Sequence, residues 1–366
     1  MKKDSKTIYL VIGIILIFLI AIFSISITQN KNTLKVGAIL GLTGSGSFYS
    51  EDVKNGMLLA QKQLSKEGID LEIIFEDNKT DPKESVTAFN KLNNADNVDM
   101  IVSLFSVTSV PLASLANEDK LPLMVSITSA KDIGKNPYVL QYYLKAEDYA
   151  YPIAEEIINK YKKIAIIYCL DEFGKSVSKS FSDKFVELGG EIVILESYNI
   201  SDLDFKTQLI KIKNSNAQAI VFSGFKPHYI SIIKNLEEMN LKIPFFEISP
   251  NTMYPSIIKE AGDFTEGVVA ISLEFPINQN LKFKEDFLRY YSKEPNVASS
   301  LGYDMIYMIG NVTKGKKLER KDIIDKFITQ KNFNTLNGLV TINEYGEFSF
   351  KTYKIKVENG KLVPIE

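Results

Sequence analysis

Three turns in the first 130 residues of the chain carry side chains that could bind a small ligand. They run over residues 43–49, 103–109 and 126–129, and they are rich in Ser and Thr but poor in formal charge. Hydroxyls and backbone N–H groups of this kind can hold a carboxylate without a buried cation. Each turn follows an apolar run, and in a parallel sheet such turns leave the strands at the edge where ligands bind. The pattern predicts a ligand-binding site and does not by itself indicate a reaction.

The elements that must position these turns alternate along the chain in two sets. Short apolar runs predict buried strands, and amphipathic segments between them predict helices. The expected strands are 34–40, 71–75, 98–102, 121–125 and 138–142 in the first set, and 163–169, 191–195, 217–222 and 244–248 in the second. The body is too long for one hydrophobic core. We therefore expect an α/β fold with two doubly wound parallel-sheet lobes.

The last part of the chain does not continue this alternation. Helices are expected near 281–292, 299–312 and 321–329, followed by strands at 339–342, 348–357 and 362–365. Turns rich in Asn and Gly separate these strands, which is typical of hairpins. The sequence thus predicts an antiparallel ribbon on one lobe.

The amino terminus predicts a membrane segment over residues 1–31. Lys2, Lys3 and Lys6 precede an uncharged run over 7–30 that is long enough to span a bilayer as a transmembrane helix. Lysines before the run place the body that follows on the extracytoplasmic face. The alternative is a signal peptide cleaved near residues 24–26, which would release the body into the periplasm. We favour an uncleaved anchor.

Composition excludes several classes of partner and reaction. A formal net charge of −2 and a pI of about 5.8 give no excess of positive charge that would indicate nucleic-acid binding. The glycine-rich stretch 41–46 lacks the order of a dinucleotide or phosphate loop, and no G-x-S-x-G turn occurs. His228 is the only histidine, and we expect it at the surface beside Pro227. We expect no enzyme activity, no cofactor and no metal site, and a buried role for the single cysteine, Cys169.

One basic cluster interrupts this ordinary charge distribution. A solvated loop that runs into a helix would explain it, and contact with lipid headgroups is the alternative. The cluster consists of Lys314, Lys316, Lys317, Arg320 and Lys321.

Several motifs, in their order along the chain, resemble the leucine/isoleucine/valine-binding family of periplasmic binding proteins. The similarity covers essentially all of residues 34–366. The motifs are the opening 37–44 with Tyr49, the groups 76–78, 81–83 and 90–92, the strand 121–126 with its early proline, the turn 171–174, the late turn 261–267, and the pair Tyr303-Asp304.

The resemblance implies a type I periplasmic binding protein fold, in which a hinge of three crossing strands joins two lobes. Crossings near Tyr143, Ala270 and Asn337 would divide the body into a first lobe of 32–143 plus 271–336 and a second lobe of 144–270 plus 337–366. Such lobes close over a small solute, most often an amino acid. The solute then passes to the permease of an ABC-type importer.

In the first lobe, the resemblance assigns ligand contacts to the three turns. Tyr49 matches a tyrosine at the cleft rim, and Phe105 and Ser106 match the loop that holds the ligand carboxylate. Thr128 and Ser129 match the next turn, which contacts the same head group. Ordinary helix capping uses the same residue types and remains the alternative role of these hydroxyls.

In the second lobe, this sequence departs from the family. Phe173 replaces the usual tyrosine, and Phe225 with Lys226 occupies the place of an aromatic pair. Core packing of the two rings and solvation of the lysine are the alternatives. The acidic residue that holds a ligand ammonium group is replaced by Ser249 and Pro250. We hypothesise that Glu247 or Asp171 takes over this role.

The predicted function is an extracytoplasmic binding protein that closes over a small carboxylate-bearing solute. An amino acid delivered to an ABC importer is the favoured case. A ligand-sensing ectodomain that reports to a membrane signalling partner is the alternative. The importer is favoured because the sequence carries no second spanning segment and no output domain.

Overall fold

The computed structural model describes residues 33–131, 133–248, 254–273 and 280–365. Its first sheet is parallel and has the order β2-β1-β3-β4-β5. The expected strands are present, although the third and the fourth each begin two residues later than predicted. The strands are β1 (Leu34–Leu40), β2 (Leu71–Asp77), β3 (Met100–Leu104), β4 (Leu123–Ser126) and β5 (Val139–Gln141).

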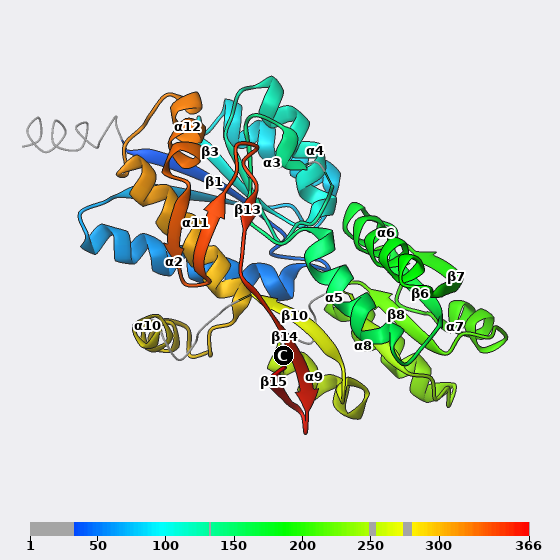
Figure 1. Ribbon diagram of the computed structural model, residues 1–366. Helices are drawn as coiled ribbons and strands as arrows, with labels where there is room; N and C mark the ends of the chain where they lie inside the picture. The colour runs from blue at the N-terminus through cyan, green and yellow to red at the C-terminus, as the bar shows by residue number, and fades with distance from the viewer. Residues whose placement is uncertain (1–32, 132, 249–253, 274–279, 366) are drawn as a thin grey trace, which may run out of the picture. The chain divides into compact units, whose positions relative to one another are not determined.

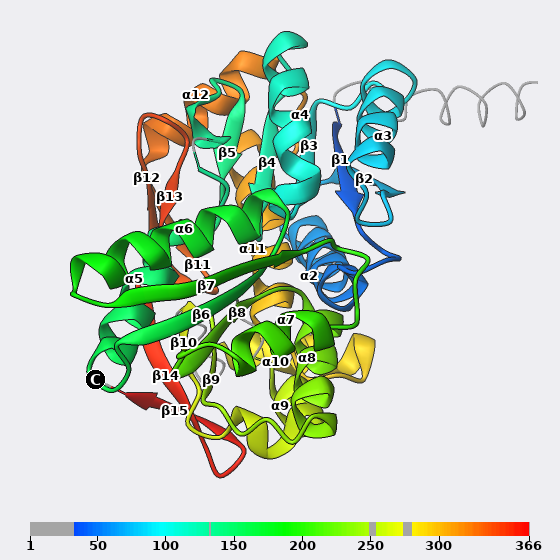
Figure 2. The same ribbon diagram turned by 90° about the vertical axis from the view of Figure 1, so that its right-hand side faces the viewer.

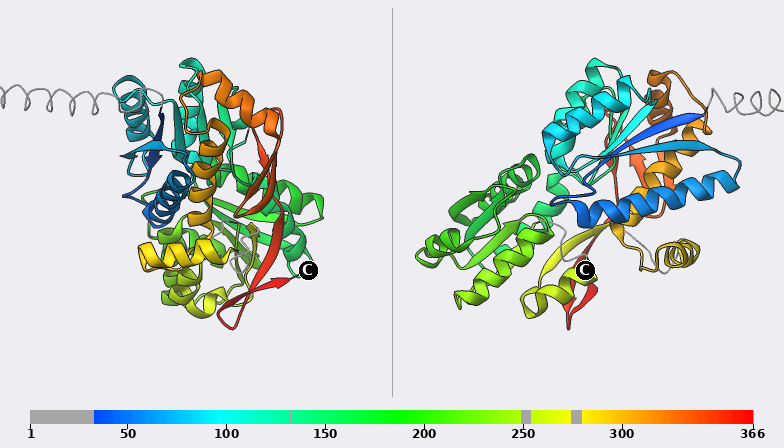
Figure 3. Two further views of the ribbon diagram at one scale, coloured as in Figure 1. Left: turned by 90° about the vertical axis from the view of Figure 1, so that its left-hand side faces the viewer. Right: turned by 180° about the vertical axis from the view of Figure 1, so that it is seen from behind.

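Helices cover both faces of this sheet because its strands are apolar on both sides. Leu34, Val36 and Ala38 of β1 belong to one buried cluster, and Ile39 belongs to another. The first cluster includes residues of α2 (Ser47–Lys66) and α11 (Val297–Thr313). The second includes residues of α3 (Pro82–Asn94) and α4 (Ser106–Glu118). Figures 1 and 3 show these two pairs of helices on opposite faces of the sheet.

Two glycines allow α2 and α11 to pack closely against each other. A Cβ added at Gly56 would lie 2.0 Å from the carbonyl oxygen of Ser299, and one at Gly302 would lie 2.1 Å from that of Val53. Both obstacles are backbone atoms, which cannot rotate away. The two helix backbones therefore cross where neither carries a side chain.

We expect Gly302→Ala to lower the free energy of unfolding by about 2 kcal/mol, because the new methyl group forces the helices apart. Urea unfolding followed by circular dichroism would measure this change. The matched control is Glu51→Ala on the exposed side of α2, which should stay within about 0.5 kcal/mol of the parent protein. Equal stability of the two variants would refute the close crossing.

The second sheet is also parallel and has the order β7-β6-β8-β9. Figure 2 shows α5 and α6 on one side of its strands and α7 and α8 on the other. Its strands are β6 (Lys163–Cys169), β7 (Glu191–Tyr198), β8 (Ala219–Ser223) and β9 (Phe245–Glu247), and its helices are α5 (Ala146–Ile158), α6 (Glu172–Glu187), α7 (Lys206–Lys213) and α8 (Lys226–Glu238).

The carboxyl-terminal strands do not form the single ribbon that the sequence predicted. They divide between two antiparallel sheets, β11-β12-β13 and β10-β14-β15. The expected strand 348–357 is two strands, because β13 pairs with β12 whereas β14 pairs with β10. The bounds are β10 (Val269–Leu273), β11 (Asn332–Thr335), β12 (Gly338–Ile342), β13 (Phe348–Ser349), β14 (Thr352–Glu358) and β15 (Lys361–Ile365).

Short elements complete the described chain. The remaining helices are η1 (Ile133–Lys135), α9 (Pro255–Ala261), η3 (Gly262–Thr265), α10 (Leu281–Tyr291) and α12 (Arg320–Gln330). The expected membrane segment 1–31 lies outside the described residues. Within the described part of the chain, no helix is both long and apolar enough to cross a bilayer.

A buried hydrogen-bond network surrounds Asp304 on α11. Its carboxylate accepts hydrogen bonds from the Tyr142 hydroxyl (2.9 Å), the Asn337 side-chain amide (2.7 Å) and the Leu336 N–H (2.8 Å). Burial raises the pKa of Asp304 to about 6, although the hydrogen bonds oppose this shift. Asn337, where the resemblance implied a crossing between lobes, lies in the turn between the paired strands β11 and β12. The network therefore joins the end of β5, α11 and this hairpin.

Candidate ligand-binding site

A pocket lies between the carboxyl ends of the first-sheet strands and those of β6 and β8. It contains about 510 Å³ of space between atoms, part of it open to solvent. Its lining is mostly aromatic and apolar. The described residues that line it are Tyr49, Phe105, Ser106, Ile127, Tyr143, Cys169, Asp171, Phe173, Gly224, Phe225 and Tyr254.

The first-sheet side of the pocket is built at the amino terminus of α4. Phe105 precedes the helix with φ 65° and ψ 143°, a backbone conformation that costs a residue with a side chain about 1–3 kcal/mol. This conformation ends β3 abruptly and presents Phe105 and Ser106 to the pocket. Strain of this kind is concentrated at functional sites.

Hydroxyl groups behind Ser106 fix its position. Its Oγ lies 2.8 Å from Oγ1 of Thr128 and accepts a hydrogen bond from the Ser129 N–H at 3.3 Å. The Ser129 hydroxyl in turn donates to the Leu144 carbonyl at 2.8 Å. Thr128 and Ser129 are buried and are absent from the pocket lining. They are placed to orient Ser106.

Asp171 is the one formally charged residue among the described residues that line the pocket. It caps α6, where its Oδ1 accepts a hydrogen bond from the Gly174 N–H at 2.7 Å. Burial raises its pKa from 3.8 to about 6, and the Gly174 hydrogen bond partly offsets this effect. Near pH 7 the pocket therefore contains one carboxylate in apolar surroundings, which favours a cationic group on a ligand.

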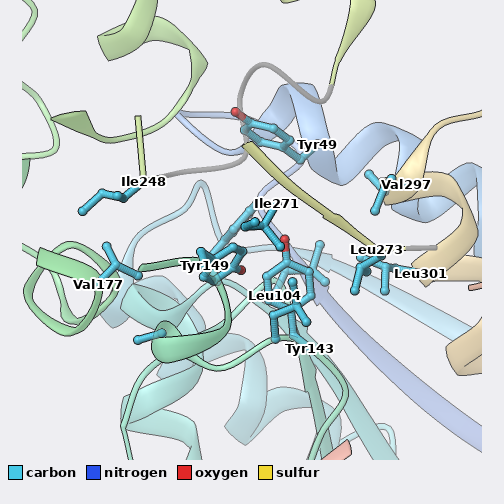
Figure 4. Packing of buried hydrophobic residues seen from close by; sticks show 14 of the residues in the cluster. Tyr49, Leu104, Tyr143, Tyr149, Val177, Ile248, Ile271, Leu273, Val297 and Leu301 are labelled. Atoms are coloured by element: carbon cyan, nitrogen blue, oxygen red, sulfur yellow. The ribbon is translucent and has the colours of Figure 1, made fainter. Parts of the chain in front are cut away.

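Aromatic rings from both sheets meet at the pocket. The centroids of Phe105 and Phe225 are 5.3 Å apart in an edge-to-face arrangement, and Tyr49 lies 5.2 Å from Tyr254. The ring centroids of Tyr143 and Tyr149 are 6.1 Å apart, and Figure 4 shows both rings close to Leu104. Edge-to-face rings pack well around apolar ligand groups and against one another.

Tyr49 connects α2 with the start of α8. Its hydroxyl accepts a hydrogen bond from the backbone N–H of Lys226 at 3.1 Å. The Lys226 side chain is not in the pocket lining. Its Nζ lies 2.9 Å from Glu260 and 4.5 Å from the ring centroid of Phe48. The charge of Lys226 is therefore partly neutralised, and its backbone makes the contact with Tyr49.

Glu247 ends β9 and is 1% exposed. It is absent from the described lining of the pocket, but its negative charge acts with burial to raise the pKa of Tyr49. The same charge reinforces the effect of burial on Tyr229. Glu247 thus acts electrostatically on a residue that lines the pocket.

Residues 33–361 match the sequence profile of the periplasmic binding protein family. The chain belongs to this family. Its members are extracytoplasmic solute-binding proteins of ABC transporters rather than enzymes.

The relatives of this periplasmic binding protein resemble it over most of their length. A leucine-, isoleucine-, valine-, threonine- and alanine-binding protein of Pseudomonas aeruginosa is 24% identical, over 90% of this chain and 91% of the relative. The structure of a Thermotoga maritima leucine-binding protein gives a TM-score of 0.80 at 22% identity and covers 91% of this chain and 98% of its own.

A further structural neighbour was crystallised with a different kind of ligand. This Rhodopseudomonas palustris solute-binding protein in complex with benzoate gives a TM-score of 0.81 at 19% identity, over 91% of this chain and 95% of its own. At these identities the structures establish the type I periplasmic binding protein fold and leave the ligand open.

Six of the site residues expected from the sequence of this periplasmic binding protein line one pocket. They are Tyr49, Phe105, Ser106, Asp171, Phe173 and Phe225. The other four, Thr128, Ser129, Lys226 and Glu247, surround it at the positions described above.

Sequence reasoning missed several pocket residues. Ile127 and Tyr143 follow β4 and β5, Cys169 ends β6, and Gly224 follows β8. Their position at strand ends was the available signal. Ile127 and Gly224 have no polar side chain, and the sequence reasoning assigned no ligand contact to Tyr143 or Cys169. Cys169 is buried, as expected.

The surface position expected for His228 was wrong. His228 is fully buried, its Nδ1 accepts a hydrogen bond from the Phe225 N–H at 3.2 Å, and its Nε2 lies 2.9 Å from the Ile200 carbonyl oxygen. Burial lowers its pKa. Its ring therefore caps α8 and holds Phe225 in place.

Proposed function

We propose that this protein binds an amino acid between two lobes and delivers it to the permease of an ABC importer. The observation that supports this proposal best is the composition of the pocket lining. An apolar, aromatic lining surrounds one carboxylate from the second sheet, while the amino terminus of α4 contributes Ser106 from the first. An α-amino acid presents the complementary groups: a carboxylate, an ammonium group and an apolar side chain.

In the proposed complex, Ser106 and the N–H groups at the start of α4 hold the ligand carboxylate. The helix dipole and the unpaired N–H groups of its first turn favour an anion there. The sequence left two candidates for the ammonium group, Glu247 and Asp171. We assign it to Asp171, because Asp171 lines the pocket. The rings of Phe105, Phe173 and Phe225 surround the side chain.

The names of relatives support the ligand class. The Pseudomonas aeruginosa protein is named for binding five apolar or small amino acids, and a Streptococcus pneumoniae neighbour was solved with isoleucine. The benzoate complex of the Rhodopseudomonas palustris protein supports a second class, aromatic carboxylates. Asp171 favours the amino acid, because a buried carboxylate repels a ligand whose only charge is negative.

We further propose two lobes, one containing the β1–β5 sheet and the other the β6–β9 sheet. The first and second crossings remain near Tyr143 and Ala270. The pairing of β13 with β12 and of β14 with β10 supports a third crossing at residues 350–351. Residues 1–31 serve as an uncleaved membrane anchor that holds the body on the extracytoplasmic side.

A thermal-shift comparison of matched ligands tests the proposed ligand class. Leucine at a hundred times its dissociation constant should add about 2.7 kcal/mol of stability. Two analogues of the same skeleton are the controls: 4-methylpentanoate lacks the ammonium group, and 3-methylbutylamine lacks the carboxylate. Both should stabilise the protein much less. A shift by 4-methylpentanoate or benzoate that matches the best amino acid would refute the amino-acid assignment.

Glu247→Gln should change amino-acid affinity by less than about threefold, since the side chain acts on Tyr49 from outside the described pocket lining. Isothermal titration calorimetry with the best amino acid would measure the change. A loss as large as that caused by substitution of Asp171 would assign the ammonium group to Glu247 instead.

A further inference from the structure

The basic cluster of the sequence lies beside the first residue of the folded body. The N–H of Leu34, where β1 begins, donates a hydrogen bond to the carbonyl of Gly315 at 3.0 Å. A Cβ added at Gly315 would lie 2.3 Å from the carbonyl oxygen of Asp70, just before β2. The segment 314–321 is therefore packed against the loops that precede the first two strands.

Further contacts tie this segment to the end of α3 and to the loops before β3 and β4. Lys317 Nζ lies 3.3 Å from Asp99, and the Arg320 guanidinium donates to the Asp119 carbonyl (3.1 Å) and the Asn93 side-chain oxygen (2.8 Å). All these loops lie at the amino ends of parallel strands. The pocket lies at the carboxyl ends, so the segment occupies the opposite end of the same sheet.

Three lysines of this segment are accessible to a partner outside the described chain. Lys314, Lys316 and Lys321 are exposed and form no ion pair with the residues that the structure describes. Glu319 and Asp322 are the acidic residues next to these lysines in sequence, and Asp70 lies beside Gly315 in space. We call Lys314, Lys316, Lys317, Arg320 and Lys321 the basic face.

The chain that precedes Leu34 restricts what the basic face can meet. The apolar run ends at Ile27, and seven residue-to-residue steps join it to Leu34. Fully extended, these steps span at most about 25 Å. If the run crosses a bilayer, Leu34 and the adjacent basic face cannot move far from the lipid headgroups.

We propose that the basic face lies against anionic phospholipid headgroups and orients the body on the membrane, with the pocket at the end of the sheet that points away from this contact. The proposal rests on the membrane anchor of the proposed function. Lysines close to an anionic surface are attracted individually, and the attraction decays within a Debye length. A short tether keeps them inside that range.

Amine acetylation of the full-length chain in vesicles tests this contact. We compare phosphatidylcholine vesicles with and without phosphatidylglycerol and measure modification of each lysine by mass spectrometry. Lys314, Lys316 and Lys321 should react about tenfold more slowly on the anionic vesicles, and high salt should restore their rates. Internal controls are Lys213, Lys234 and Lys242, which are exposed and belong to the second-sheet region. Equal slowing of both sets would overturn the proposal.

Substitution provides a second readout that does not depend on the modified lysines. On anionic vesicles, hydrogen exchange in the loop 95–98 should be slowed in the parent protein. The combination of Lys314→Gln, Lys316→Gln and Lys321→Gln should abolish this slowing. The matched combination of Lys213→Gln, Lys234→Gln and Lys242→Gln should preserve it; loss of slowing in both combinations would contradict a specific face.

Flotation separates failure of the contact from failure of the anchor. A full-length chain that floats with phosphatidylcholine vesicles but shows no selective protection refutes only the basic face. A chain that does not float with these vesicles refutes the anchor and overturns the proposed contact with it.

Discussion

Replacing Asp171 with asparagine is expected to weaken amino-acid binding about 100-fold at neutral pH, because the variant removes the charge proposed to pair with the ligand ammonium group. Asparagine is nearly isosteric and caps helices as well as aspartate, so α6 should keep its start. Isothermal titration calorimetry of both proteins with the best amino acid measures the loss. An affinity within threefold of the parent would remove Asp171 from the site.

The same residue predicts a pH dependence. Because burial raises the pKa of Asp171 to about 6, the carboxylate becomes protonated below that pH and affinity should fall with further acidification. The sign for stability is opposite. The pKa of Asp171 is higher in the folded state than in the unfolded state, where it is near 3.9. Its protonation therefore stabilises the ligand-free fold below about pH 3.9, and this contribution disappears as pH rises through about 6. Asp171→Asn should flatten both dependences; an unchanged affinity profile in the variant would assign the titration to another group.

Replacing Asp304 with leucine is expected to lower the free energy of unfolding by about 4 kcal/mol. The substitution leaves the buried Tyr142 hydroxyl and the Asn337 amide without their acceptor, and each unsatisfied buried donor costs about 1–3 kcal/mol. Urea unfolding followed by circular dichroism measures the change. Asp304 lies far in sequence from its partners, so the loss should affect the whole cooperative unit.

Asp304→Asn separates the hydrogen bonds from the volume of the side chain. The asparagine amide oxygen can still accept a hydrogen bond from one of the donors around Asp304, whereas its NH₂ group faces the remaining donors. We therefore expect the free energy of unfolding to fall by about 2 kcal/mol. If leucine were tolerated as well as asparagine, the network would contribute little to stability and the buried position would matter only for packing.

The alternation of apolar runs with amphipathic segments was sufficient to predict both parallel sheets. β1 begins and ends at the predicted residues, and most other strands agree within a few residues, because burial on both faces gives a strand a local signature. The turns at the strand ends were equally visible. Ser106 was expected at the site from its turn and from the family resemblance, Tyr49 from the resemblance, and Asp171 as one of two candidates for the ammonium group. These features depend on residues close together in the chain.

What the sequence did not show concerns contacts between distant residues. Thr128 and Ser129 have the same chemistry as Ser106 but lie behind it, and only the packing of two neighbouring turns decides which hydroxyl reaches the pocket. Lys226 pairs with Glu260 on another helix, which no spacing in the sequence indicates. His228 was expected at the surface because a neighbouring proline suggests a loop, yet the ring is buried as a helix cap.

The amino-acid sequence by itself determined the α/β class, the strands of the two sheets and the strand-end turns from which a ligand site could be built. The tertiary structure alone decided which turns meet in one pocket, which sheet each carboxyl-terminal strand joins, and that the basic face lies beside the first residue of β1. Hydrophobic periodicity is a local property and is legible along the chain. Strand pairing and pocket geometry depend on contacts between residues far apart in sequence, whose free energy appears only when the chain has folded.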